Sequence, residues 1–159
     1  MQLLRSHLQT ANDQDDTLVI PFFIALLESD DASLIWAGYG VRSSLESHQS
    51  LTEALNIEVV SLRLIDERFY HLDTCFFPLP GGRVVYYPPA FDELTLAEIR
   101  RRVPTDKRIE VGESDALRFA CNAARIDDTL ITNHVSKDLR SSLAAWGFDV
   151  KTTPLDEFM

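Results

Sequence analysis

The sequence predicts an α/β fold built from about three strand–strand–helix–strand units. Three stretches follow one plan, in which a short β-branched or aromatic strand leads into a turn, a helix and another strand. Their equivalent points, Trp36, Tyr86 and Thr132, give a period of roughly 46 to 50 residues, which is typical of repeat architectures. A further strand precedes each stretch across a tight turn and completes the unit.

The helices are expected near residues 44–55, 94–103 and 136–146, because each carries a start or stop signal. The start signals are the capping-box pairs Ser43 with Glu46 and Thr95 with Glu98, and Ser136; the stop signals are Pro104 and Gly147. We find no linker and no change of composition along the chain. We therefore expect a single repeat domain at residues 17–159, after a polar arm at residues 1–16, with units at about 17–65, 68–112 and 117–155.

The strands that lead each unit are predicted from "VIPFFIALL", "HLDTCFF" and "FACNAARI". Residues two apart on a strand share a face, so His71, Asp73 and Cys75 would point the same way. We expect His71 and Asp73 to turn toward the end of the strand near a common axis of the repeats. Cys75 should pack deeper, among apolar neighbours.

The composition excludes several classes of function. The 159 residues carry a net charge of −10, so basic surface for nucleic acid is scarce. No apolar run reaches the ~20 residues that a membrane span needs, and the N-terminus lacks the pattern of a signal peptide. Two cysteines cannot build a disulfide framework. We expect reduced thiols, a cytoplasmic location, and neither nucleic acid nor membrane as a partner.

Four residues are candidates for chemistry. His71 could move a proton near neutral pH, and Asp73 could bind a cation. Arg42, between a strand end and a helix start, could pair with a carboxylate through its planar fork. Asn122 could donate a hydrogen bond into a site. Each has a structural alternative that stays open: a satisfied histidine in a hairpin, an ion-pair carboxylate, a surface arginine and a turn asparagine.

Other chemistries lack their signals. Cys75 and Cys121 lie in apolar surroundings and read as buried structural thiols, not as reactive nucleophiles. No pair of histidines has metal-ligand spacing and no CxxC occurs, so we expect no metal. GxGxxG, Walker and GxSxG motifs are absent too, and we expect no cofactor.

These motifs together resemble the guanidine-modifying superfamily of arginine deiminases, amidinotransferases and dimethylargininases. "RFYHLDTCFF" is similar to the H-x-D strand of that family, "GYGVRSS" to its G-x-G-x-R-T/S segment, and "FACNAA" to a stretch in bacterial amidinotransferase-type members. The resemblance spans roughly residues 33 to 158. It implies an α/β propeller of five strand–strand–helix–strand units, the pentein fold, of which this chain would form a part.

The resemblance also implies roles for individual residues. His71 matches the general acid/base, Asp73 the carboxylate that binds the substrate guanidinium, and Arg42 the arginine that receives the substrate carboxylate. The H-x-D form favours the deiminase and amidinotransferase branches. Three features of the family pattern are missing from this sequence. They are the nucleophilic cysteine in a glycine-rich C-terminal segment, an acidic E-G-x-D motif, and two upstream repeats.

Three hypotheses follow. The first is a member, or C-terminal part, of a guanidino hydrolase or amidinotransferase that acts on arginine-like substrates through a covalent cysteine intermediate and is inactive as this chain alone. The second is a non-catalytic propeller fragment that binds an arginine-like ligand. The third is an assembly module that completes its ring of sheets with another chain. The apolar "LVIPFFIALL" favours a homo-oligomer or a companion chain, unless residues 1–16 fold back over it.

Overall fold

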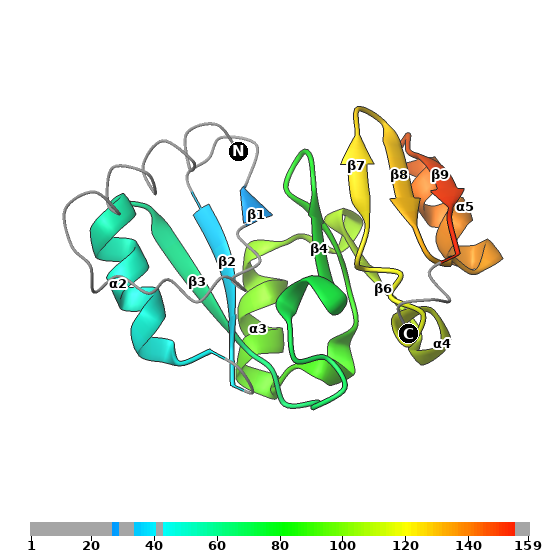
Figure 1. The fold of residues 1–159 in the computed structure, drawn as a ribbon. Helices are drawn as coiled ribbons and strands as arrows, with labels where there is room; N and C mark the ends of the chain where they lie inside the picture. Colours follow the sequence, from blue (N-terminus) through cyan, green and yellow to red (C-terminus); the bar gives the residue numbers. More distant parts are fainter. Residues whose placement is uncertain (1–26, 29–33, 41–42, 155–159) are drawn as a thin grey trace.

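The computed structural model describes residues 27–28, 34–40 and 43–154, and within them the chain forms three separate three-stranded sheets (Figure 1). In each sheet the middle strand pairs antiparallel with the preceding strand and parallel with the following one. The sheets are β1 (Leu27–Glu28), β2 (Leu34–Tyr39) and β3 (Glu58–Arg63); β4 (Phe76–Leu79), β5 (Arg83–Tyr86) and β6 (Arg108–Glu110); and β7 (Ala124–Ile126), β8 (Thr129–Thr132) and β9 (Asp149–Thr152).

A helix connects the two parallel strands of every sheet, because parallel neighbours need a long crossover. These helices are α2 (Leu45–Leu55), α3 (Glu93–Arg102) and α5 (Lys137–Ala145), each within one residue of the predicted bounds. The α/β class and the strand–strand–helix–strand order are thus confirmed. The shorter elements are α4 (Glu113–Ala116) and the 3₁₀ turns η1 (Leu72–Thr74), η2 (Pro88–Ala90) and η3 (Thr105–Lys107).

The predicted helix caps are only partly correct. Ser136 caps α5 through its side chain, which accepts a hydrogen bond from the Leu139 amide, and Gly147 follows the helix with a φ of 91°. The two capping boxes are wrong. α2 starts after Ser44, without a side-chain cap bond, and the cap of α3 is Asp92, whose carboxylate accepts from the Thr95 amide.

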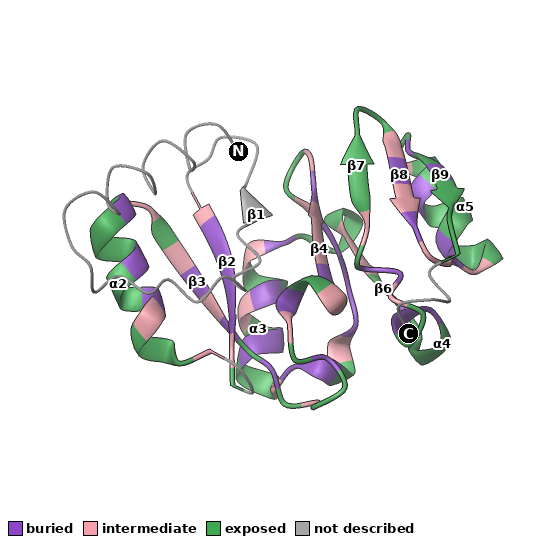
Figure 2. Ribbon diagram, in the orientation of Figure 1, coloured by how far each residue is buried: buried purple, intermediate pink, exposed green. Residues whose placement is uncertain are grey.

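One hydrophobic core runs through all three units, with a smaller cluster of Ile35, Leu51 and Leu55 beneath α2. The Trp36 ring lies 5.2 Å from the Phe76 ring and joins the first unit to the second. Arg83 joins the second unit to the third, since its guanidinium lies over the Trp146 ring and donates to the Trp146 carbonyl at 3.0 Å. Exposed residues gather on the outer helix faces and on β7 (Figure 2).

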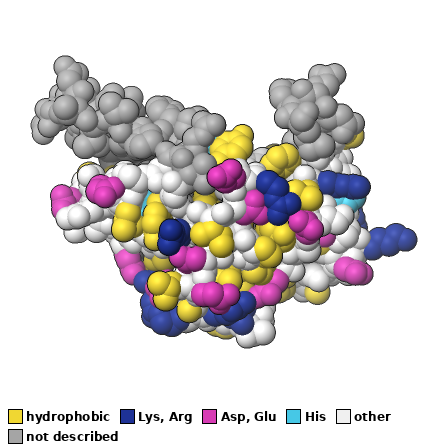
Figure 3. All heavy atoms as spheres, turned by 90° about the horizontal axis from the view of Figure 1, so that it is seen from below, with side chains coloured by type: hydrophobic (Ala, Val, Ile, Leu, Met, Phe, Trp, Pro, Cys, Tyr) yellow, Lys and Arg dark blue, Asp and Glu magenta, His cyan; other side chains and the backbone are white. Residues whose placement is uncertain are grey.

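The surface carries both signs of charge. On the face seen from below, acidic and basic side chains are interspersed with apolar ones (Figure 3). Several are paired, as in Arg102, which contacts Glu98 on its own helix and Glu58 on β3. Among the residues that the structure describes, no helix is long and apolar enough to cross a membrane.

Candidate functional site

His71 and Asp73 lie on a 3₁₀ turn and not on a strand, so the predicted strand "HLDTCFF" is wrong over its first half. η1 covers Leu72–Thr74, and β4 begins only at Phe76. The Thr74 side chain and amide both donate to the His71 carbonyl, at 2.6 and 3.1 Å. The backbone closes on itself through these bonds instead of pairing in the sheet, which is a known alternative for threonine.

The predicted alternation of side chains over residues 71–75 is therefore lost. His71 is half-buried, with its ring centroid 4.5 Å from that of Tyr70, and Asp73 is exposed. Cys75 is fully buried, as expected. The residue between the two polar groups, Leu72, is buried at 1% exposure and anchors the turn in the core.

Strand β2 touches this turn through Gly38, the first glycine of "GYG". A Cβ on Gly38 would lie 2.9 Å from the Leu72 Cβ, and one on Gly40 would lie 2.6 Å from the Leu64 carbonyl oxygen. Gly40 also has a φ of 131°, which glycine alone adopts without strain. The glycine-rich segment and the H-x-D turn are thus in direct contact. Arg42, in the same segment, lies outside the described residues.

Asp73 and Asn122 meet across the boundary between the second and third units. The Asn122 Nδ2 donates to the Asp73 Oδ2 at 2.9 Å. Asn122 does not lie on a strand either, because β7 covers only Ala124–Ile126 and not the whole of "FACNAARI". Phe119, with a φ of 57°, turns the chain just before it.

A hollow of about 400 Å³ opens beside this pair. Among the described residues that line it, Asp73 is the only charged one, and its carboxylate favours a cation as the ligand. The remaining lining is apolar or neutral: Phe76, Phe77, Cys121, Asn122, Ala123, Ala124, Ile131, Thr132, Asn133 and Thr153. His71 does not line it. Sequence reasoning missed Thr132, Asn133 and Thr153, although Asn133 directly follows a predicted strand, where site residues commonly lie.

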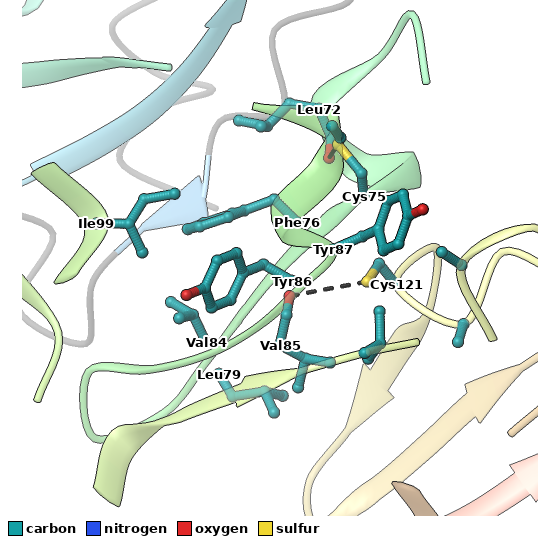
Figure 4. Packing of buried hydrophobic residues seen from close by; sticks show 14 of the residues in the cluster. Leu72, Cys75, Phe76, Leu79, Val84, Val85, Tyr86, Tyr87, Ile99 and Cys121 are labelled. Carbon is teal, nitrogen blue, oxygen red and sulfur yellow. Dashed lines mark hydrogen bonds between the residues drawn. The ribbon is translucent and has the colours of Figure 1, made fainter. Parts of the chain in front are cut away.

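The two thiols are buried structural groups, as predicted. Cys121 is 1% exposed and its Sγ lies 3.8 Å from the Val85 carbonyl, while Cys75 packs nearby against the Leu72 turn (Figure 4). Burial raises the pKa of both thiols well above its ordinary range; for Cys75 the nearby Cys121 and Asp73 add to the rise. Neither thiol is a ready nucleophile at neutral pH.

Metal ligands do not gather around the hollow. Within the described ranges, no group of three or more histidine, cysteine or acidic side chains could hold a metal ion. The groups at this site that can take part in chemistry are the Asp73 carboxylate, the neighbouring His71 and several neutral hydrogen-bonding side chains.

The repeated units and the His71–Asp73 turn fit the guanidine-modifying superfamily, and comparison with known proteins finds homologues of the chain in that superfamily. It is 58% identical over 125 residues to the bifunctional arginine dihydrolase/ornithine cyclodeaminase ArgZ of Synechocystis sp.. It is 34% identical over 125 residues to the N(G),N(G)-dimethylarginine dimethylaminohydrolase of Mycobacterium tuberculosis. These matches cover 79% of this chain, but 18% and 41% of the relatives. No sequence-family model matches the chain.

Solved structures agree. The N-terminal domain of ArgZ, an arginine dihydrolase solved with its substrate bound, superposes with a TM-score of 0.81 at 55% identity. That match covers 83% of this chain and 49% of the domain, so the chain spans about half of it. The dimethylarginine hydrolase of Pseudomonas aeruginosa shares the fold at 18% identity, with a TM-score of 0.64.

Proposed function

We propose that this chain is part of a guanidino hydrolase that binds L-arginine in the hollow beside Asp73. The observation that carries the proposal is the Asp73–Asn122 pair at a hollow of about 400 Å³, in which Asp73 is the one charged residue of the described lining. A guanidinium group presents N–H donors in a fork that matches a carboxylate. The relatives named as arginine dihydrolases support arginine as the ligand, and hydrolysis over amidino transfer.

In this proposal His71 is the general acid/base, two residues from the carboxylate that holds the substrate. Arg42 receives the substrate carboxylate. The departing amine needs a proton, which an imidazole can supply near neutral pH. Attack on the guanidinium carbon needs a thiolate, and the buried Cys75 and Cys121 do not supply one. We therefore expect this chain alone to bind arginine without converting it.

Binding is tested by calorimetric titration of L-arginine into the wild type and Asp73→Asn. We expect saturable binding that Asp73→Asn weakens about tenfold to a hundredfold, the effect of losing a hydrogen bond to a charged group. Asp128→Asn, which changes an exposed carboxylate on the β7–β8 turn, should preserve binding. Equal affinity in Asp73→Asn would overturn the proposal.

Agmatine, which lacks the carboxylate, tests Arg42: Arg42→Ala should weaken arginine binding and leave agmatine binding unchanged.

The alternative function is that of an assembly module. We infer that the three units belong to an α/β propeller and that a second copy or a companion chain covers their open ends. The support is the repeated unit order and the match to about half of the ArgZ domain. Light scattering at micromolar concentration should find an oligomer. A stable monomer that binds no hydrophobic dye would count against it.

The two buried reduced thiols suit a cytoplasmic location.

A further inference from the structure

We propose that Asn122 is a positioning residue, whose side-chain amide fixes the orientation of the Asp73 carboxylate toward the ligand. The inference rests on the proposed function, in which Asp73 binds the guanidinium. It differs from a direct role of Asn122 in substrate binding. Its basis is the 2.9 Å bond between Asn122 Nδ2 and Asp73 Oδ2, which spans 49 positions of sequence and joins two units.

The backbone of Asn122 is held firmly in the third unit. Its backbone amide donates to the Phe119 carbonyl at 3.0 Å. Just before it, Cys121 is buried, and the Thr132 hydroxyl contacts the Ala120 carbonyl at 3.4 Å. These contacts tie the Asn122 backbone to the core of the third unit. Asp73, which is exposed like Asn122, lies on a short 3₁₀ turn, where its carboxylate can rotate unless something holds it.

The chemistry of an amide suits this task. A bidentate guanidinium needs one lone pair from each carboxylate oxygen, and each oxygen has two. The Asn122 bond occupies one lone pair of Oδ2 and leaves a lone pair on each oxygen available. Because the amide is uncharged, it holds the carboxylate without neutralising its charge. A lysine or arginine at this place would neutralise it. Asp73 thus keeps its full attraction for a cation.

The first experiment needs no ligand. Three-bond couplings measured by NMR report how many rotamers the Asp73 side chain populates. We expect one rotamer in the wild type and averaging among rotamers in Asn122→Ala. The matched control is Gln49→Ala, which removes a similar amide–carboxylate bond to Glu53 on α2, far from the hollow. Averaging already present in the wild type, or one rotamer kept in Asn122→Ala, would overturn the inference.

The second experiment is a double-mutant cycle on L-arginine affinity, with unfolding measured alongside. Asn122→Ala should weaken binding about threefold to tenfold, the effect of one net hydrogen bond, without changing stability. In the Asp73→Asn background it should have no further effect. Equal affinity in Asn122→Ala and the wild type refutes the positioning role. A further loss in the Asp73→Asn background instead supports direct contact with the ligand and also refutes it.

The two proposals can fail separately. If the wild type binds no arginine, the proposed function fails, and the rotamer measurement alone decides whether Asn122 orients Asp73. If the wild type binds arginine and Asn122→Ala binds equally well, the proposed function stands and the inference is wrong.

Discussion

The Leu72 side chain occupies the space that a side chain on Gly38 would need. An added Cβ would lie 2.9 Å from the Leu72 Cβ and 3.3 Å from the Leu64 Cδ1. Leu72 lies between His71 and Asp73, so its packing against β2 fixes the position of the turn that carries both residues. A substitution at residue 38 thus acts on the candidate site without being part of it.

Gly38→Ala should lower the free energy of unfolding by about 1–3 kcal/mol, the usual cost of overpacking a filled core. Because the added methyl displaces Leu72, arginine affinity should fall as well. Denaturant unfolding and calorimetry measure the two effects. Gly112→Ser is the control, since a Cβ there meets no atom within 4 Å and serine suits the start of α4. Similar losses in both variants would contradict the packing explanation.

His48 should make the protein less stable at acid pH. Its ring is 3% exposed and bonds to the Ser61 hydroxyl at 2.8 Å and the Gly38 carbonyl at 3.3 Å. Burial lowers the pKa of His48 below its ordinary value, so protonation favours the unfolded chain. Its contribution is complete above pH ~6.5 and is lost as the pH falls toward the lowered pKa, by at most about 1.4 kcal/mol per pH unit.

Urea unfolding between pH 8 and pH 5 measures this effect. The wild type should lose stability on the acid side, and His48→Gln, although less stable throughout, should lose less. An unchanged slope in His48→Gln would assign the acid sensitivity to other groups.

Arg83→Leu should loosen the contact between the second and third units. The change keeps an apolar stem but removes the bond to the Trp146 carbonyl and the cation over the Trp146 ring. We expect a loss of about 1–2 kcal/mol in unfolding free energy. Arg125→Leu is the control, because the Arg125 side chain donates to the Asp127 carbonyl within its own hairpin turn. Equal losses in the two variants would show that the contact contributes nothing specific.

Cys75 and Cys121 should resist alkylation in the folded protein. A thiolate is the reacting species, and burial raises the pKa of both thiols. Iodoacetamide at pH 8, followed by mass spectrometry, should label neither cysteine until denaturant is added. Fast labelling of either thiol under native conditions would reopen its assignment as a nucleophile.

The sequence predicts the repeated units and helices well, because apolar periodicity and stop signals such as Gly147 are local. It fails where a side chain bonds to the backbone. Thr74 closes the turn after His71, and Asp92 takes the cap that we assigned to Thr95. The approach of Asn122 to Asp73 was beyond reach, since it depends on how the second and third units pack, which no single stretch encodes.

Each end of the described fold carries one of the chain's two tryptophans, Trp36 on β2 and Trp146 at the end of α5. Replacing either tryptophan by phenylalanine leaves a protein with one tryptophan, whose fluorescence reports unfolding at that end of the fold. Repeat units that contact only their neighbours can melt one at a time, whereas a shared core favours melting together. Coincident transitions from the two single-tryptophan proteins would mean that the three units act as one cooperative body, with no autonomous folding of either end.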